Sequence, residues 1–587
     1  MDVMSEDKVQ LLSNSYGQVA YETFGSGRLA FADKSGFIRF LDEQNMTPYP
    51  ILLRPRRFGK STFVQMLKCF YDISYKDRYD EIFSGTDIYK INPVTHNTYH
   101  VVDFDFSGVS GDDKNTLIDS FIIAVKKGIT DFKSRYSDFV FEPAETERKT
   151  PSGFIKSFFE AYMLYASRKS LYLMIDEYDN FASSILSHDL KLFKAITGTG
   201  GFLKDFYAAV KDGAKNIIAK TFITGVSSLS LDSLTSGFNI ALNVTSDKCF
   251  NEYAGFTENE LKRLIPELVN IKKIGVTADE VISRMKPVYD GYCFNRKAKH
   301  TVFNSSMCLY YLNIIQKEEE FLPPEEYMDP ASDHDGSKLQ LLFEIAEDGI
   351  ADEIVENYLG GDMFFLNKLA ENINLNKTAK YNRDQLRSML YYLGYLTIDR
   401  EASDSSVLAL KIPNLFMSKL FAQCIANLRL KTSTEFTDSV LDISSLCEVK
   451  DDISSFALSC TEFLSGIFTN QVLSHMSEMA LNLTLYTKLK SMRGIFVEMQ
   501  KSLRISGQGE KFADLVVTVN KGKSSQCIYI FELKYTAKTE ASESKIRRLA
   551  KEAEDQVHKY KTAIEFRGRQ VKAYAMVFAG SDCVYSG

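Results

Sequence analysis

Short apolar runs alternate with segments of helical periodicity along the first third of the chain. The run "YPILL" precedes "STFVQMLKCFYDI", in which Phe63, Leu67 and Phe70 recur at helical spacing. Further strand-like runs follow in "TYHVVDFDFSG", "SLYLMIDEYDN" and "KNIIAKTFITGVSS". Two helical stretches, around 114–133 and 151–168, separate the first two of these runs. This alternation predicts an α/β layer built on a mostly parallel sheet.

The rest of the chain has a different pattern. Over residues 260–480 the apolar periodicity is mostly helical, apart from a strand-like pair in "YLTIDREASDSSVLALKIPN". Helices followed by a small hairpin predict a winged-helix or lid element. The acidic segment "FLPPEEYMDPASDHDG" has the composition of a solvated linker or insertion. Near the end, "KFADLVVTVNKGKSSQCIYIFELKY" predicts two strands joined by a polar turn.

Length and composition limit the possible functions. A chain of 587 residues is expected to form two to four domains. The net charge of −7 excludes a global basic field, so any surface for nucleic acid has to be local. The nine cysteines are scattered and form no C-x-x-C pair, so we expect neither a disulfide framework nor a zinc site. No uninterrupted apolar run approaches about 18 residues, which predicts no membrane span and an intracellular, cytoplasmic protein.

The clearest candidate chemistry lies in "PILLRPRRFGKSTFVQMLKCF". Its centre fits the end of the phosphate-binding pattern G-x-x-x-x-G-K-[ST], with Gly59, Lys60, Ser61 and Thr62. In such a loop the glycine lets the backbone approach the phosphates, and the lysine reaches the β- and γ-phosphates. The first hydroxyl can ligate Mg²⁺. These four residues also recur by chance, so the loop alone does not establish a nucleotide site.

The first glycine of the pattern is replaced by Arg54. This change restricts the turn, as does Pro55, but it removes no essential hydrogen-bond donor. Together with Arg56 and Arg57, Arg54 adds positive charge where a polyphosphate would lie. We expect these arginines either to contribute to the phosphate environment or to brace the loop.

A second motif supports the nucleotide site. A P-loop ATPase needs a carboxylate at the end of a neighbouring strand, and the apolar run before Asp176 and Glu177 supplies it. Asp176 is the candidate for holding Mg²⁺ through water or Ser61, and Glu177 for orienting or deprotonating water. Thr224, in "TFITGVSS", lies where a polar residue could sense the γ-phosphate, although a simple Thr-Gly turn after a strand explains it equally well.

Several further motifs occur in a fixed order along the chain. They are "FADKSGFI", "LLRPRRFGKST", "LMIDEYDN", "FITGVSSLS", "YDGYCFN", "YYLGYLTI" and "LKIPN". From about Phe31 to its end, the chain resembles AAA-ATPase-like proteins that carry a C-terminal PD-(D/E)XK nuclease-like domain. In that family the arginine-rich loop without a first glycine is a regular feature. The chain departs from the family at Asn304-Ser305, where Asn-Pro is common.

The resemblance implies a multidomain α/β protein with a P-loop fold related to AAA+ and STAND ATPases. We expect a P-loop AAA-ATPase-like domain over 1–260, a helical lid or winged-helix-like region over 261–430, and a restriction-endonuclease-like α/β domain over 431–587. The segment Tyr289–Tyr292 in "YDGYCFN" has two interpretations. It either reads nucleotide and couples the lid to it, or forms a packed structural turn.

The C-terminal strands carry a second set of candidate residues. Period two places Glu532 and Lys534 on one face of their strand, and Asp514 begins the preceding strand. One hairpin can therefore bring the three side chains together. Two carboxylates hold a hard cation such as Mg²⁺, or Mn²⁺, and the lysine can orient water or stabilise a charged phosphate transition state. Without that chemistry, the same pattern is an exposed polar strand edge.

The resemblance adds three residues to this site. Glu498, in "GIFVEMQ", lies where the nuclease superfamily often has another acid. Gln556 and Tyr560, in "AEDQVHKYK", lie on a helix that faces the site in similar families. The segment "GQGEKFAD" before the first acid lacks the Gly-Arg pair that the family often shows, which is compatible with altered substrate contact or with loss of activity.

The leading functional hypothesis is an ATP-binding ATPase coupled to a metal-dependent nuclease that acts on DNA or RNA. One alternative is a nucleotide-controlled binding switch whose nuclease fold is catalytically silent. Another is a bare NTPase in a signalling role. A homo-oligomer or a protein partner is compatible with all three hypotheses, and no membrane partner is expected.

Overall fold

The computed structural model forms two compact units. The first comprises residues 1–329, 345–347 and 365–415, and the second comprises 330–344, 348–364 and 416–587. The structure describes residues 11–26, 29–91, 93–166, 169–186, 189–198, 200–229, 231–322, 324, 333–370, 380–432, 441–449, 453–490, 492, 495–505, 509–521 and 525–587. Residues 325–332 of the predicted acidic linker lie outside the described residues. The division into three domains stays a prediction.

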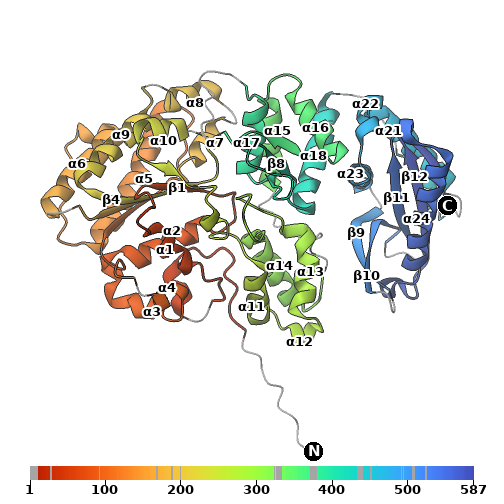
Figure 1. Cartoon of the computed structure of the whole chain (residues 1–587), viewed down its shortest axis with the longest axis horizontal. Helices are drawn as coiled ribbons and strands as arrows, with labels where there is room; N and C mark the ends of the chain where they lie inside the picture. Colours follow the sequence, from red (N-terminus) through yellow and green to blue (C-terminus); the bar gives the residue numbers. More distant parts are fainter. Residues whose placement is uncertain are drawn as a thin grey trace, which may run out of the picture. The chain divides into compact units, whose positions relative to one another are not determined.

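A five-stranded sheet forms the centre of the first unit (Figure 1). Its strands are β1 (Pro50–Leu53), β2 (His100–Asp105), β3 (Leu171–Asp176), β4 (Ile218–Gly225) and β5 (Leu242–Asn243). Their order across the sheet is β2-β3-β4-β1-β5, and each pairing of neighbours is parallel. β1 and β3 are buried along their whole length, as expected for interior strands covered on both faces. The predicted parallel sheet is confirmed.

Helices cover both faces of this sheet. α2 (Lys60–Tyr71) lies on one face, and α5 (Lys114–Arg135), α6 (Pro151–Tyr165) and α9 (Phe202–Asn216) lie on the other (Figure 1). The predicted helical stretches correspond to α2, α5 and α6. Phe63, Leu67 and Phe70 of α2 are buried, which explains their helical spacing.

The remaining part of the first unit is mostly helical. α11 (Glu258–Leu268), α13 (Ala278–Tyr289) and α14 (Ser305–Glu318) pack on one another. α17 (Arg383–Tyr392) precedes the antiparallel pair β7 (Thr397–Ile398) and β8 (Leu408–Lys411), and β6 (Phe364–Leu366) completes a small sheet of order β6-β8-β7. The predicted hairpin after the helices is present. Its assignment as a winged helix stays a prediction.

The second unit contains a mixed sheet of order β13-β12-β11-β10-β9. Its strands are β9 (Ile495–Ile505), β10 (Gly509–Val519), β11 (Cys527–Thr536), β12 (Val571–Ala579) and β13 (Asp582–Ser586). β10 and β11 form the predicted antiparallel hairpin, and β11 and β12 are parallel. α24 (Glu543–Tyr560) connects these two parallel strands and buries Ala553 and Val557 against Val516 and Ile530 of the sheet.

The longer helices outside this sheet also belong mainly to the second unit. They are α15 (Asp333–Glu344), α16 (Ile350–Gly360), α18 (Leu415–Thr432), α21 (Ser454–Ile467), α22 (Asn470–His475) and α23 (Glu478–Lys490). α23 packs on β9 and β11, and α21 packs on β13. Because α23 begins beside β11, its first residue can contact the polar residues at the end of that strand.

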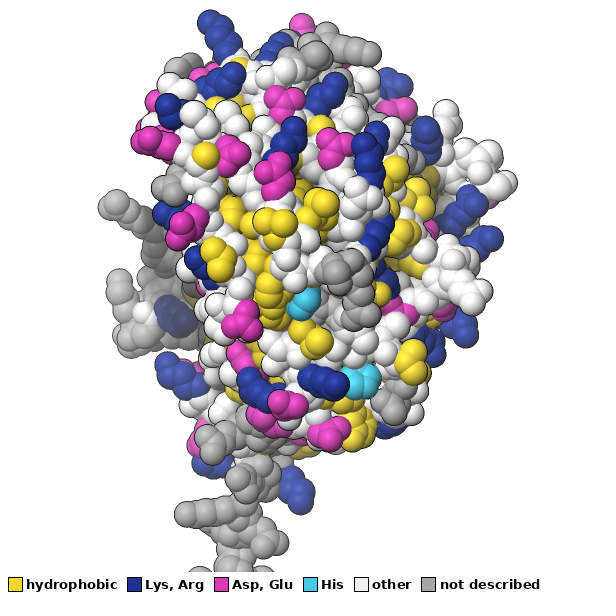
Figure 2. Space-filling view, turned by 90° about the vertical axis from the view of Figure 1, so that its left-hand side faces the viewer, with side chains coloured by type: hydrophobic (Ala, Val, Ile, Leu, Met, Phe, Trp, Pro, Cys, Tyr) yellow, Lys and Arg dark blue, Asp and Glu magenta, His cyan; other side chains and the backbone are white. Residues whose placement is uncertain are grey.

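The surface mixes apolar and charged side chains. Figure 2 shows apolar side chains in the middle of one face, with acidic and basic side chains around them. Exposed large apolar residues of the first unit include Val140, Met163 and Leu164. Within the described parts of the chain, no helix combines the length and the apolar character that crossing a bilayer requires.

Candidate functional site

The turn between β1 and α2 has an unusual backbone. Gly59, the residue before the helix, has a φ of 90°, and Arg57 has a φ of 68°. The left-handed region is open to glycine but costs other residues about 1–2 kcal/mol. The loop is therefore held in a strained conformation immediately before α2, whose first N–H groups have no partner within the helix.

Arg54, at the position of the missing glycine, is buried with only 1% of its surface exposed. Its guanidinium donates to the carbonyls of Leu53 (2.7 Å), Thr245 (2.9 Å) and Phe250 (2.5 Å). The guanidinium carbon also lies 4.0 Å from the ring centroid of Phe294. Burial lowers the pKa of Arg54. The side chain points at backbone carbonyls, so this geometry agrees with the bracing role expected for Arg54 and not with a phosphate contact.

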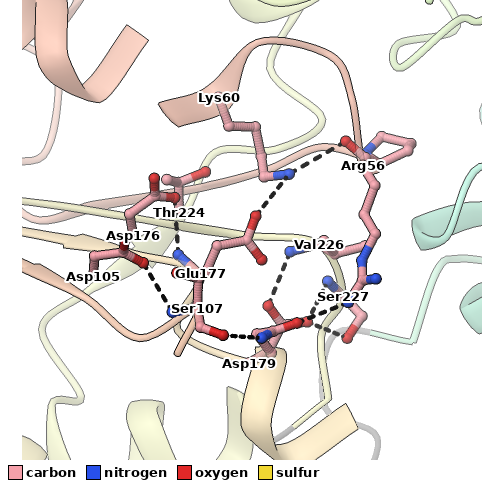
Figure 3. A network of polar contacts seen from close by, with 12 residues as sticks. Arg56, Lys60, Asp105, Ser107, Asp176, Glu177, Asp179, Thr224, Val226 and Ser227 are labelled. Carbon is pink, nitrogen blue, oxygen red and sulfur yellow. Dashed lines mark hydrogen bonds and ion pairs between the residues drawn. The ribbon is translucent and has the colours of Figure 1, made fainter. Parts of the chain in front are cut away.

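Lys60 and Glu177 lie within ion-pair distance of each other (Figure 3). Lys60 Nζ is 3.4 Å from Glu177 Oε1 and donates to the carbonyl oxygen of Pro55 at 3.3 Å. Glu177 has a φ of 51° and is, after Arg57, the second non-glycine residue of this region in the left-handed conformation. The loop lysine, expected to reach the β- and γ-phosphates, and the acid after β3, expected to act on water, are therefore brought together.

Asp176, at the end of β3, is buried beside the loop. Burial, and then the negative charge of Glu177, raise the pKa of Asp176 to about 6. Asp105, which pairs in register with Asp176 from the end of β2, adds to this effect. The nearby Ser61 hydroxyl counteracts part of the rise in its pKa. A divalent cation at this point would stabilise the ionised carboxylates, because a nearby opposite charge favours the charged form.

Two hollows adjoin the loop. The first has a volume of about 250 Å³, and its lining includes Arg57–Phe63 together with Tyr21, Phe31 and Leu309. The second has a volume of about 410 Å³. The charged residues that line the second are Arg56, Arg57, Asp103, Asp105, Asp176 and Glu177. One hollow thus offers aromatic and aliphatic side chains, and the other offers opposite charges around Ser61.

Thr224 and Asp179 organise the end of β4. The Thr224 hydroxyl donates to the carbonyl of Leu52 at 2.6 Å, so a phosphate contact by its proton would require this bond to break. Asp179 is fully buried and accepts from the backbone N–H groups of Val226 (3.0 Å) and Ser227 (2.8 Å) (Figure 3). Burial raises the pKa of Asp179. Asp179 therefore fixes the backbone that follows β4.

The segment Tyr289–Tyr292 is a buried turn. Gly291 has a φ of 98°, and a Cβ atom there would lie 2.1 Å from the carbonyl oxygen of Pro413. The side-chain amide of Asn414 donates to the carbonyl of Asp290 at 2.7 Å. Of the two interpretations of this segment, the contacts favour the packed turn.

The same region touches the phosphate-binding loop. The Phe58 ring lies 4.9 Å from the Tyr292 ring in an edge-on arrangement. At the start of α14, the Ser305 hydroxyl donates to the carbonyl of Arg57 at 3.0 Å, and the Ser306 N–H donates to the same oxygen at 3.2 Å. The departure from Asn-Pro at residue 305 thus supplies a hydroxyl donor that proline lacks.

In the second unit, the predicted triad of polar residues is assembled on β10 and β11. Lys534 Nζ lies 3.0 Å from Glu532 Oε1, and Asp514 Oδ2 accepts from the N–H of Leu533 at 2.8 Å. Burial, and then the charge of Asp514, raise the pKa of Glu532 to about 7. Glu532 and Lys534 therefore share a face of β11, and Asp514 is close enough to influence Glu532.

Helices supply further polar groups to this site. The Tyr560 hydroxyl of α24 lies 3.1 Å from Glu532 Oε2 and 3.0 Å from Gln556 Oε1, so both residues expected on this helix reach the site. Glu478, the first residue of α23, forms a 3.0 Å ion pair with Lys534. Because Glu478 precedes the hairpin by a full helix, the sequence pattern gave no sign of its approach.

The remaining predicted acid is paired with a lysine. Glu498 lies on β9 and forms a 2.5 Å ion pair with Lys501. Among the residues that the structure describes, no group of three or more His, Cys, Asp or Glu side chains is arranged to hold a metal ion. The donor set at the second site therefore rests on the carboxylates of Asp514 and Glu532, whose hard oxygens suit Mg²⁺.

Comparison with protein families assigns both regions. A family described as predicted AAA-ATPase matches residues 15–235, and the PD-(D/E)XK nuclease superfamily matches residues 505–586. The chain joins an AAA-ATPase-like domain to a PD-(D/E)XK nuclease superfamily domain. The matched ranges contain the P-loop residues and Asp176 in the first domain, and Asp514 and Lys534 in the second.

A curated relative covers only part of the chain. An uncharacterized protein in the vnfD 5' region of Azotobacter chroococcum mcd 1 is 25% identical over 300 residues. The aligned region is 50% of this chain and 49% of that protein, so the chain matches about half of its relative's length. The name of that protein states no activity.

Sequence reasoning missed three residues that lie at the two sites. In the AAA-ATPase-like domain, Asp105 stands in a quoted strand and Asp179 follows the two predicted acids, but their roles depend on strand register and burial. Glu478 precedes the range matched by the nuclease superfamily and reaches Lys534 only through the packing of α23. Of these three residues, only Asp179 had a signal in the sequence, because it is the third acid of "IDEYDN".

Proposed function

We propose that this chain is an ATP-binding P-loop ATPase coupled to a metal-dependent PD-(D/E)XK-type nuclease that acts on nucleic acid. The observation that carries the proposal is the convergence of Lys60, Ser61, Asp176 and Glu177 at the carboxyl ends of parallel strands. Ligands bind at this end of open α/β sheets.

The roles in the ATPase follow from the charges around the loop. Lys60 binds the β- and γ-phosphates, with Arg56, Arg57, Gly59 and Thr62 around them. Ser61 and Asp176 hold Mg²⁺, which when bound neutralises charge on the phosphates. Glu177 orients or deprotonates water. The aromatic and aliphatic hollow beside the loop suits the nucleotide base.

The roles in the nuclease follow from the hairpin. Asp514 and Glu532 hold Mg²⁺ or Mn²⁺, and Lys534 acts on water or on the phosphate. Tyr560 positions Glu532 through their 3.1 Å contact. Glu498 is a further candidate ligand if Lys501 releases it.

Incubation of the purified chain with labelled DNA and RNA, with and without ATP and with Mg²⁺ or Mn²⁺, tests the proposal. We expect cleavage that requires the cation and changes with ATP. Lys534→Ala is the control for the nuclease, and Lys60→Ala is the control for the ATPase. Absence of cleavage under all conditions, together with ATP hydrolysis, would refute the nuclease half alone.

A second candidate function is a nucleotide-controlled binding switch with a silent nuclease fold. It is favoured by the ion pairs that Lys534 makes with both Glu478 and Glu532, which hold the lysine and one carboxylate against each other. Partner binding that depends on ATP, without cleavage, would support this function.

A further inference from the structure

A hollow of about 520 Å³ lies on the first unit, and none of the P-loop residues lines it. It is bordered by α1 (Ile38–Leu41) and α4 (Asp87–Ile91), which lie close together in Figure 1, and by segments 248–252 and 298–299. The rings of Phe37 and Phe40 line it, with their centroids 6.1 Å apart. The hollow therefore presents two aromatic side chains, with Ile91, Cys249 and Ala298 as further apolar lining residues, beside its charged groups.

Basic side chains are in excess around this hollow. Those that line it are Arg39, Lys90, Lys248 and Lys299, against the two carboxylates of Asp87 and Glu252. Lys90 and Asp87 form a 2.8 Å ion pair with each other. For Arg39, Lys248 and Lys299, all exposed, no ion pair with a carboxylate is formed within the described residues. Three cations are thus available to a ligand.

The loop 295–300 extends this positive charge. It carries Arg296, Lys297, Lys299 and His300, all exposed, and no acid. Side chains from other segments hold its backbone through hydrogen bonds. Arg400 donates to the carbonyls of Ala298 (3.1 Å) and Lys299 (2.7 Å), and Asn251 donates to that of His300 (3.0 Å). The loop is therefore ordered before any ligand arrives, which lowers the entropic cost of binding.

We propose that this basic groove, defined by Phe37, Arg39, Phe40, Lys248 and Lys299, binds a single strand of nucleic acid. The cations contact phosphates, and the partly exposed Phe37 ring provides a face on which an unpaired base stacks. The Arg39 guanidinium lies 4.6 Å from the centroid of the Phe40 ring, so this second ring becomes a stacking face when Arg39 turns to a phosphate. A single strand fits better than a duplex, because the bases of a duplex are stacked on each other and not open to these rings.

This inference rests on the proposed function in one respect. The proposed nuclease acts on nucleic acid. The inference is that the first unit makes one of the protein's contacts with that nucleic acid. In a protein with a net charge of −7, a local excess of cations is the condition for such a contact.

The test measures fluorescence anisotropy of labelled oligo(dT) and oligo(U) with the full chain, in EDTA and without ATP. The variant Arg39→Glu/Lys248→Glu/Lys299→Glu removes three phosphate contacts. Each contact contributes about 0.7 to the slope of log affinity against log salt for single strands. We expect the slope to fall by about 2 and the affinity at about 0.1 M salt to fall roughly 100-fold.

The matched control is Lys126→Glu/Lys127→Glu/Lys133→Glu, three exposed lysines of α5. It changes the net charge equally and is expected to bind within about threefold of wild type, because charges beyond a Debye length of about 10 Å are largely screened. Phe37→Leu, which keeps the side chain apolar, is expected to weaken binding roughly five- to hundredfold through lost stacking. Circular dichroism and ATP binding verify that each variant is folded.

Three results would overturn the inference. They are unchanged affinity and salt slope in the groove variant, an equal loss in the α5 control, and tighter binding of duplex or of an acidic polypeptide than of a single strand. Assays of ATP hydrolysis and of cleavage test the proposed function separately. Strand binding by the groove without ATP hydrolysis or cleavage would refute that function and leave the groove intact.

Discussion

Replacement of Arg54 by glycine restores the common phosphate-loop pattern but removes a buried brace. Three carbonyls lose a charged donor, and a buried polar group without a partner costs about 1–3 kcal/mol. Loss of the contact with the Phe294 ring adds about 1 kcal/mol. Relief of the buried charge offsets part of this sum. We expect Arg54→Gly to lower the free energy of unfolding of the first unit by at least about 3 kcal/mol.

Urea denaturation followed by circular dichroism measures this change, since the chain contains no tryptophan for fluorescence. Hydrogen exchange of peptides that span β1 locates it. ATP affinity is measured in parallel by calorimetry, and we expect it to weaken because the loop loses its support. Arg54→Lys should recover little, since an ammonium cannot donate in the geometry of the guanidinium fork.

Arg56→Gly is the matched control. Arg56 donates to the side-chain oxygen of Asn180 at 2.7 Å and is only partly buried, so its loss should cost about 1 kcal/mol or less. Equal stability of Arg54→Gly and wild type, with faster ATP hydrolysis, would show that Arg54 is merely tolerated and would refute the bracing argument.

The remaining predictions concern the two sites. Lys60→Ala should weaken ATP binding roughly 10- to 100-fold, since a charged hydrogen bond contributes about 1.5–3 kcal/mol; wild-type affinity in calorimetry would contradict the P-loop assignment. Glu177→Gln should bind ATP normally and hydrolyse it about 10²- to 10⁴-fold more slowly in a phosphate-release assay. Asp514→Ala should abolish Mn²⁺ binding, and Lys534→Ala should retain Mn²⁺ binding while losing cleavage; both should keep ATPase activity. Because the pKa of Glu532 is raised to about 7, stability from its protonated form is present below its unfolded pKa of about 4.5 and is lost as pH rises to about 7. The denaturation midpoint of the second unit should therefore fall across this window in wild type and not in Glu532→Gln.

The sequence predicts the elements whose cause is local. The apolar run that ends at Asp176 becomes the interior parallel strand β3, and the spacing of Phe63, Leu67 and Phe70 gives the buried face of α2. The hairpin that carries Asp514 and Glu532 follows from alternation and a polar turn. These features depend on neighbours in the chain, so the sequence contains their cause.

The features that sequence analysis missed depend on distant contacts. The direction of Arg54 is decided by the carbonyls of Thr245 and Phe250, which belong to a much later segment. Asp105 joins Asp176 only because β2 and β3 are in register. Glu478 reaches its site through helix packing. A charged residue in a motif therefore indicates which chemistry is available. The direction in which its side chain points can be known only from the folded structure.

The contact between Gly291 and Pro413 has a consequence for natural variation. No side chain fits at Gly291 while the Pro413 carbonyl lies 2.1 Å from the place of a Cβ atom, and Asn414 holds the carbonyl of the residue before that glycine. The "DGY" and "IPN" motifs lie far apart in the chain but pack directly against each other, and each depends on the other. Relatives should inherit or lose them together, and a homologue with only one of the motifs should have a rearranged or missing hairpin between α17 and β8.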